Sequence, residues 1–299
     1  QCIMNIRNRR REEDYFAPRV LKEAALWLEQ NQDADKFFLT VESFDPHEPG
    51  LIPSHYLRMY WRGEGHEQVV SAYGDVSALD EALVARTQAN YSGEVTMCDR
   101  WFGYFLESLR VLGRLEDTAI VFTSDHGHSI GDRDYLGKRG YPSTPEVFDL
   151  PLLIRFPRAE HAGVASDILV QHHDIAAAIL EFAGLEPPEE IEGQSFLTPA
   201  IEAQPGGRDH VTVGWGSAMT AVTDRWWLNA KVDGTGVLLY DLAAGDPFAR
   251  NAATEHPDIV NDLFARAVAD AGGGFPDWLV ELARDQADAP GCSELVARA

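Results

Sequence analysis

The residues of this sequence that could do chemistry lie in three short polar segments. Asp125 and His126 lie just beyond the apolar run 119–122, after Thr123 and Ser124, and a carboxylate beside an imidazole can ligate a metal ion. His47 lies in Asp-Pro-His-Glu-Pro, and an imidazole can transfer a proton near neutral pH. Lys138 and a metal could stabilise charge on sulfuryl or phosphoryl oxygens. The set predicts a site for an oxyanion substrate.

Each of these residues also has a plainer interpretation, and the sequence leaves both open. Asp125 could be a helix N-cap, and His126 could bond only to backbone. His47, which has prolines on both sides, could simply stiffen its loop, and Lys138 could be an exposed loop lysine. The adjacent pair His172-His173 is interpreted as flanking a helix N-cap, because neighbouring residues diverge on a helix or strand.

The apolar patterns indicate which elements position the polar segments. Helical stripes and short apolar runs alternate in α/β order, which predicts a mainly parallel sheet flanked by helices. In such sheets ligands bind outside the carboxyl ends of the strands, where the polar segments fall. The expected helices are 17–31, 77–113 and 174–183, and the expected strands are 36–44, 118–123 and 150–156, with a surface excursion at 50–76 and a loop at 127–146.

The pattern changes near residue 205. Four short, closely spaced candidate strands follow, some of them separated by glycine-containing turns, and together they predict a small antiparallel subdomain. These strands are 211–213, 218–222, 226–232 and 237–240, and a helix at 258–271 would cover them. We therefore expect one domain over 1–204 and a second over 205–299.

Composition limits the partners that we expect. The 299 residues carry 48 Asp and Glu against 25 Lys and Arg, a formal charge of −23. This balance argues against a nucleic-acid partner, which needs a basic face. The sequence contains no apolar run of membrane-spanning length and no secretory leader, and we assign it no cellular compartment. With three cysteines and no CxxC, we expect no disulfide framework and interpret Cys98 as a small core residue.

Five motifs, taken in order, resemble the C-terminal part of a sulfatase in the alkaline phosphatase superfamily. The resemblance runs from about residue 36 to residue 263. The motifs are Phe37-Phe-Leu-Thr-Val-Glu-Ser-Phe-Asp-Pro-His-Glu-Pro49, Ile120-Val-Phe-Thr-Ser-Asp-His-Gly127, Gly131-Asp132 with Leu136-Gly-Lys138, Val147-Phe-Asp-Leu-Pro-Leu-Leu-Ile-Arg-Phe-Pro157 and Leu239-Tyr-Asp-Leu-Ala-Ala-Gly-Asp-Pro-Phe-Ala-Arg-Asn251.

The resemblance implies a role for each candidate residue. Asp125 and His126 would be two ligands of a divalent cation, with Ca²⁺ expected first. His126 stands where the family often has Asn, and an imidazole ligand also suits Mn²⁺ or Zn²⁺. His47 would contact the sulfate or leaving-group oxygen and move a proton, and Lys138 would bind a sulfate oxygen. The implied substrate is a small-molecule or saccharide sulfate ester.

The chain also departs from the family pattern. Sulfatases attack with a formylglycine made within Cys/Ser-x-Pro-x-Arg, and neither Cys2 nor Cys98 begins that motif. The family's early Asp-Asp ligand pair is missing too. We therefore expect an incomplete enzyme that lacks an N-terminal segment, a candidate partner of this chain, and that is inactive alone. The alternatives are a phosphodiester or phosphonate monoester hydrolase of the same superfamily and a non-catalytic remnant.

Overall fold

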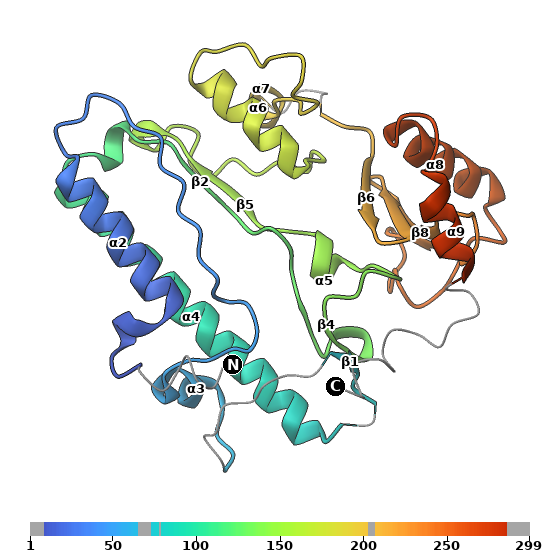
Figure 1. The fold of residues 1–299 in the computed structure, drawn as a ribbon, viewed down its shortest axis with the longest axis horizontal. Helices are drawn as coiled ribbons and strands as arrows, with labels where there is room; N and C mark the ends of the chain where they lie inside the picture. The colour runs from blue at the N-terminus through green and yellow to red at the C-terminus, as the bar shows by residue number, and fades with distance from the viewer. Residues whose placement is uncertain (1–8, 65–72, 78, 203–206, 286–299) are drawn as a thin grey trace. The chain divides into compact units, whose positions relative to one another are not determined.

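The computed structural model describes residues 9–64, 73–77, 79–202 and 207–285, which form two compact units (Figure 1). Segments of the units alternate along the chain. The first unit comprises Gln1–Thr123, His128–Lys138 and Pro151–Glu160. The second comprises Ser124–Gly127, Arg139–Leu150 and His161–Ala299. The predicted domain division between residues 204 and 205 stays a prediction.

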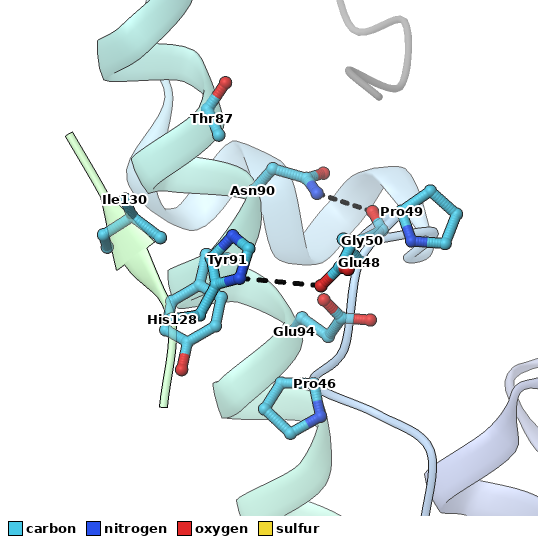
Figure 2. A pocket seen from close by; sticks show the side chains of 10 residues that line it. All are labelled: Pro46, Glu48, Pro49, Gly50, Thr87, Asn90, Tyr91, Glu94, His128 and Ile130. Carbon is cyan, nitrogen blue, oxygen red and sulfur yellow. Dashed lines mark hydrogen bonds and ion pairs between the residues drawn. The ribbon is translucent and has the colours of Figure 1, made fainter. Parts of the chain in front are cut away.

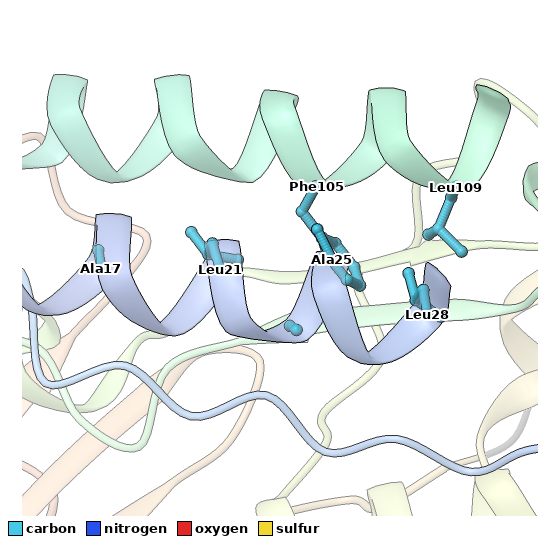
Figure 3. Packing of buried hydrophobic residues seen from close by; sticks show 7 residues of the cluster. Ala17, Leu21, Ala25, Leu28, Phe105 and Leu109 are labelled. Carbon is cyan, nitrogen blue, oxygen red and sulfur yellow. The ribbon is translucent and has the colours of Figure 1, made fainter. Parts of the chain in front are cut away.

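The first unit is built on two long helices that lie side by side, α2 (Phe16–Gln30) and α4 (Glu81–Val111) (Figures 1 and 3). Leu21 and Leu28 of α2 recur at helical spacing and pack with Phe105 and Leu109 of α4 in one buried cluster. Cys98 packs against the same cluster, and burial raises the pKa of its thiol. Both expected helices are therefore present, and Cys98 is a half-buried residue at the edge of this core.

The segment expected as a strand at 36–44 belongs to no strand ladder of the described residues. Phe37, Leu39 and Val41 pack at alternate positions against the same buried cluster. The alternation of apolar residues in the sequence therefore predicts correctly which side chains are buried. It does not predict a strand, because a strand also needs a hydrogen-bonded neighbour.

Strand β2 (Ile120–Thr123) pairs antiparallel with β5 (Leu152–Arg155), with Ile120 opposite Arg155. All strand pairings between described residues are antiparallel, so the mainly parallel sheet that we expected is not seen there. A parallel connection usually crosses over through a helix. The only helical elements between β2 and β5, a stretch that the structure describes throughout, are the single-turn helix α5 (Pro145–Phe148) and the 3₁₀ turn η3 (Asp132–Asp134).

The segment expected as a loop at 127–146 contains short strands of its own. β3 (Ser129–Ile130) and β1 (Gly74–Asp75) each pair antiparallel with β4 (Tyr135–Gly137), in the order β1–β4–β3. Helix α3 (Ser54–Tyr60) and β1 lie in the expected excursion at 50–76. Lys138 therefore directly follows a paired strand.

The second unit contains the predicted antiparallel sheet and its covering helix. The strands run in the order β6 (Val211–Trp215), β7 (Ala218–Val222), β8 (Trp226–Lys231) and β9 (Leu238–Asp241). Leu263 and Ala267 of α8 (Pro257–Asp270) pack on Met219 and Leu228 of the sheet.

The remaining elements are short. They are the helices α6 (His172–Phe182), α7 (Leu197–Glu202) and α9 (Asp277–Asp285) and the 3₁₀ turns η1 (Glu12–Asp14), η2 (Leu115–Asp117) and η4 (Pro157–Ala159). None of the helices in the described part of the chain combines the length and the apolar character that a membrane crossing requires.

Candidate active site

Lys138 and His47 meet in the first unit, although 91 residues separate them. β4 ends at Gly137 with φ at 109°, and a Cβ there would lie 2.7 Å from the Tyr73 ring, so this position needs glycine. The next residue places its Nζ 2.6 Å from Nε2 of His47. The Lys138 side chain is only 12% exposed, which rules out the interpretation as an exposed loop lysine.

The hydrogen bonds of His47 determine its tautomer. Nδ1 lies 2.7 Å from the carbonyl oxygen of Glu48, which can only accept, and a protonated Lys138 can only donate to Nε2. The geometry therefore fits a neutral imidazole with its proton on Nδ1. The ring also packs on Phe44, with centroids 4.4 Å apart. His47 is thus held by its loop while Nε2 faces the lysine.

The carboxylate of Glu48 lies at the centre of this group. Its oxygens are 3.3 Å from Nζ of Lys138, 3.3 Å from Nδ1 of His47 and 3.5 Å from Nδ1 of His128, and the hydroxyl of Tyr73 donates to it. Burial opposes the charge, but the bond from Tyr73 and the nearby His47 and Lys138 bring the net pKa of Glu48 below its usual value. Sequence reasoning missed Glu48 and Tyr73, and adjacency to His47 was the only available signal.

A small cavity of about 20 Å³, room for about one water molecule, lies beside Glu48 and against α4 (Figure 2). Asn90 of α4 donates to the carbonyl of Gly50 at 2.5 Å. Glu94, one turn further along α4, is buried. Burial, reinforced by Asp45, raises the pKa of Glu94 to about 9. Glu94 is therefore neutral at pH 7, whereas Glu48 beside it is charged.

Asp125 and His126 lie in the second unit, in the segment Ser124–Gly127. This segment is held through its backbone. Gly127 N donates to Val147 O at 2.8 Å, and Nε2 of His172 lies 2.8 Å from the carbonyl of Ser124. No helix begins directly after Asp125, since the next assigned element is the strand β3, so Asp125 is not a helix N-cap.

The pair offers two metal ligands but not a complete site. Nε2 of His126 and Oδ2 of Asp125 lie 3.5 Å apart, a separation that neighbouring ligands of one cation can have, and the Asp125 side chain is 85% exposed. Nδ1 of His126 lies 3.0 Å from the carbonyl of Gly127, so bonding to backbone and metal ligation are compatible. No cluster of three or more His, Cys, Asp or Glu suited to a metal occurs within the described residues.

The predicted site residues are therefore brought together two by two. His47 meets Lys138 in the first unit, and Asp125 lies beside His126 in the second. The convergence of all four on one anion pocket stays a prediction.

The adjacent histidines His172 and His173 lie at the start of α6. α6 begins at His172, two residues before the expected start at 174. The buried carboxylate of Asp174 accepts from the backbone N–H groups of Gln171 and Gln194, each at 2.8 Å, and from Arg208 at 2.9 and 2.7 Å. His173 contacts the same arginine at 2.6 Å. The two histidines are thus the first residues of the helix, after its N-cap Gln171, and do not flank the N-cap on both sides as interpreted. They make separate contacts, and His172 positions the segment before Asp125.

Comparisons with known proteins identify the family of this chain. The family model named Sulfatase matches residues 3–185. The N-acetylglucosamine-6-O-sulfatase of Bacteroides thetaiotaomicron is 37% identical over 180 residues, which cover 57% of this chain and 32% of that protein. The multifunctional alkaline phosphatase superfamily protein PehA of Trinickia caryophylli is 30% identical over 212 residues, 61% of this chain and 41% of that protein.

A solved structure shares the fold. The phosphonate monoester hydrolase of Agrobacterium radiobacter superposes with a TM-score of 0.73 at 21% identity, covering 87% of this chain and 61% of that one. This chain spans about a third to two fifths of the length of these curated relatives. Since the family model matches more than half of its residues, the chain belongs to the sulfatase family.

Proposed function

We propose that this chain supplies the anion-binding and leaving-group side of a sulfuric ester hydrolase. The observation that carries the proposal is the 2.6 Å contact between Nζ of Lys138 and Nε2 of His47. It places a cation beside a group that can accept and donate a proton. Family membership supports the reaction class. Relatives named for sulfated saccharides and aryl sulfates support a saccharide or small-molecule sulfate ester as substrate.

In this proposal the two residues have distinct tasks. The ammonium of Lys138 has three donors, so one of them can turn to a sulfate oxygen and stabilise the charge that develops there. Nε2 of His47 is the atom at which the imidazole can take a proton from solvent and pass it to the ester oxygen, as a nucleophile that the proposal assigns to no residue of this chain bonds to sulfur and the S–O ester bond breaks. The loop contacts of Nδ1 keep the ring in place during both steps.

Asp125 and His126 are proposed to hold a divalent cation, Ca²⁺ in the first place and Mn²⁺ or Zn²⁺ as alternatives. Such a cation would add charge stabilisation at the sulfate oxygens. Ca²⁺ takes six to eight oxygen ligands, so other residues must complete its shell. The proposal assigns the nucleophile to no residue of this chain, because the sequence contains no Cys/Ser-x-Pro-x-Arg. We predict no turnover by the chain alone.

A phosphodiester or phosphonate monoester hydrolase is the second candidate. The observation that favours it is His126 beside Asp125, because an imidazole ligand suits Mn²⁺ or Zn²⁺ better than Ca²⁺. The match to a relative named as a multifunctional member of the alkaline phosphatase superfamily also supports it. Sulfate and phosphonate esters that compete in one preparation distinguish the two candidates.

The test assays an aryl sulfate with this chain extended by a segment that carries Cys-x-Pro-x-Arg. Lys138→Ala and His47→Ala should each lower kcat/KM by about 100-fold or more. Lys22→Ala, which removes an exposed lysine of α2, is the matched control and should leave kcat/KM unchanged. Wild-type kcat/KM in both site variants would refute the roles proposed for Lys138 and His47.

A further inference from the structure

A carboxylate is an unexpected neighbour for a lysine that binds an anion. Oε1 of Glu48 lies 3.3 Å from Nζ of Lys138, so part of the positive charge offered to a substrate is already neutralised. The same carboxylate lies within 3.5 Å of the imidazole nitrogens of His47 and His128. The charge of this site is therefore balanced before any substrate arrives.

Glu48 is held in this position from several sides. The hydroxyl of Tyr73 donates to Oε1, and the Tyr73 ring itself packs against Gly137, where a Cβ would clash. The Glu48 side chain is largely buried, and Pro49 follows it in the chain. These contacts oppose a rotation of the carboxylate away from Lys138 when an anion binds.

The residues that line the cavity beside Glu48 include no second charged carboxylate. Glu94 is the other acid among them (Figure 2), and its burial, reinforced by the nearby Asp45, raises its pKa to about 9 and keeps it neutral at pH 7. A substitution at Glu48 therefore removes the negative charge that faces Lys138 from this cavity.

We propose that Glu48 is a specificity-determining residue that favours monoanionic over dianionic substrate groups at Lys138. The inference rests on the proposed function, because it takes Lys138 as the anion-binding group. An anion oxygen that accepts from Nζ on the side opposite Glu48 lies about 6 Å from the carboxylate. At that distance, each extra negative charge on the ligand weakens binding about 3- to 100-fold for effective dielectric constants between 80 and 20.

This preference matches the chemistry of the substrate classes. A sulfate monoester carries one negative charge, as does a phosphodiester, whereas a phosphate monoester carries close to two at neutral pH. A fixed carboxylate at Lys138 lets the first two classes bind and disfavours the third. Glu48 thus selects by the charge of the group, whatever the shape of the rest of the substrate.

The test compares two anions with the same tetrahedral head, methyl sulfate with one charge and inorganic sulfate with two. Their dissociation constants are measured by calorimetry with the extended protein described above. Glu48→Gln should shift the preference toward inorganic sulfate about tenfold relative to wild type, and Glu48→Ala gives a second neutral variant should the first fail to fold. Lys138→Ala should weaken the binding of both anions.

Two variants serve as controls. Glu42→Gln makes the same charge change at an exposed position six residues earlier, and it should leave the preference within twofold of wild type. Tyr73→Phe removes the donor to Glu48 but no charge, and it should shift the preference less than Glu48→Gln.

The outcomes distinguish a failure of the role proposed for Glu48 from a failure of the proposed function. If wild type binds both anions and a folded neutral variant keeps the wild-type preference, the role of Glu48 is refuted and the proposed function stands. If neither anion binds wild type, both are refuted.

Discussion

Replacing Asp174 by Asn should destabilise the second unit far more than an ordinary loss of one charge. The two oxygens of Asp174 each accept one backbone N–H and one N–H of Arg208, at distances from 2.7 to 2.9 Å. The side chain is only 2% exposed. Asn is almost the same size, so the substitution changes hydrogen bonding and charge while it leaves packing nearly intact.

The magnitude follows from counting what the amide cannot accept. Whichever oxygen becomes the NH₂ group, one backbone N–H and one guanidinium N–H then face a donor instead of an acceptor. Hydrogen bonds to charged groups contribute about 1.5–3 kcal/mol each, and removing one partner of a buried ion pair costs about 3–5 kcal/mol. We expect Asp174→Asn to lower the free energy of unfolding by about 4 kcal/mol.

The assay is urea unfolding followed by circular dichroism, with Asp209→Asn as the control. Asp209 is 75% exposed and also contacts an arginine, Arg266 at 2.5 Å, so its loss should cost about 0–1 kcal/mol. The effect should also depend on pH. Burial opposes ionisation of Asp174, but the bonds from Arg208, Gln194 and Gln171 lower its pKa on balance.

A lowered pKa means that the folded state prefers the charged carboxylate. The stability that Asp174 contributes is therefore fully present above about pH 5 and is lost as the pH falls through the folded-state pKa. The difference in the free energy of unfolding between wild type and Asp174→Asn should therefore become smaller as the pH falls. A cost below about 1.5 kcal/mol at pH 7, or one equal to that of Asp209→Asn, would refute this account of the helix start.

Three further predictions use the same unfolding assay. Gly127→Ala should destabilise by several kcal/mol because its Cβ would lie 2.1 Å from a backbone oxygen, whereas Gly103→Ala in α4, with no described atom within 4 Å of the new Cβ, should stabilise by about 0.5–1 kcal/mol. Glu94→Gln should stabilise the protein at pH 7 by about 3 kcal/mol and not at pH 4. The raised pKa of Glu94, about 9, means that the folded wild type disfavours the charged carboxylate and loses stability as the pH rises. Equal effects of the substitution at both pH values would contradict this account. Asn229→Ala should cost about 2–3 kcal/mol, since it leaves the backbone N–H and the hydroxyl of Ser143, 2.9 and 2.8 Å from Asn229 Oδ1, without that acceptor, and a cost below 1 kcal/mol would contradict it.

The sequence predicts those parts of the fold that local patterns determine. The apolar stripe of α2 predicts its bounds to within one or two residues, because helical burial repeats along one segment. The short strands β6 to β9 alternate with turns, and Gly216 and Gly234 have the positive φ values, 54° and 82°, that such turns use. In this sheet each strand pairs with the next one along the chain, so the pairing can be predicted from local sequence alone.

Pairing between distant segments is not determined locally. The alternating residues Phe37, Leu39 and Val41 look like a strand, yet they pack on helices instead of joining a ladder. The apolar run of β2 indicates a strand but neither its partner nor its direction. Lys138 and His47 were candidates from their residue types and positions, and the resemblance implied their roles, whereas Glu48 joins them only because Tyr73 and Lys138 approach from other parts of the chain.

The pairing of β2 with β5 has a practical consequence for handling this chain. Among the described residues each of these strands has a single ladder partner, so the pair forms a two-stranded ribbon. Apolar side chains on the ribbon also meet solvent, with Phe122 40% and Leu153 63% exposed. Exposed apolar side chains on a protein surface favour association with further chains. The isolated polypeptide should therefore self-associate as its concentration rises, and sedimentation velocity over a dilution series would register it.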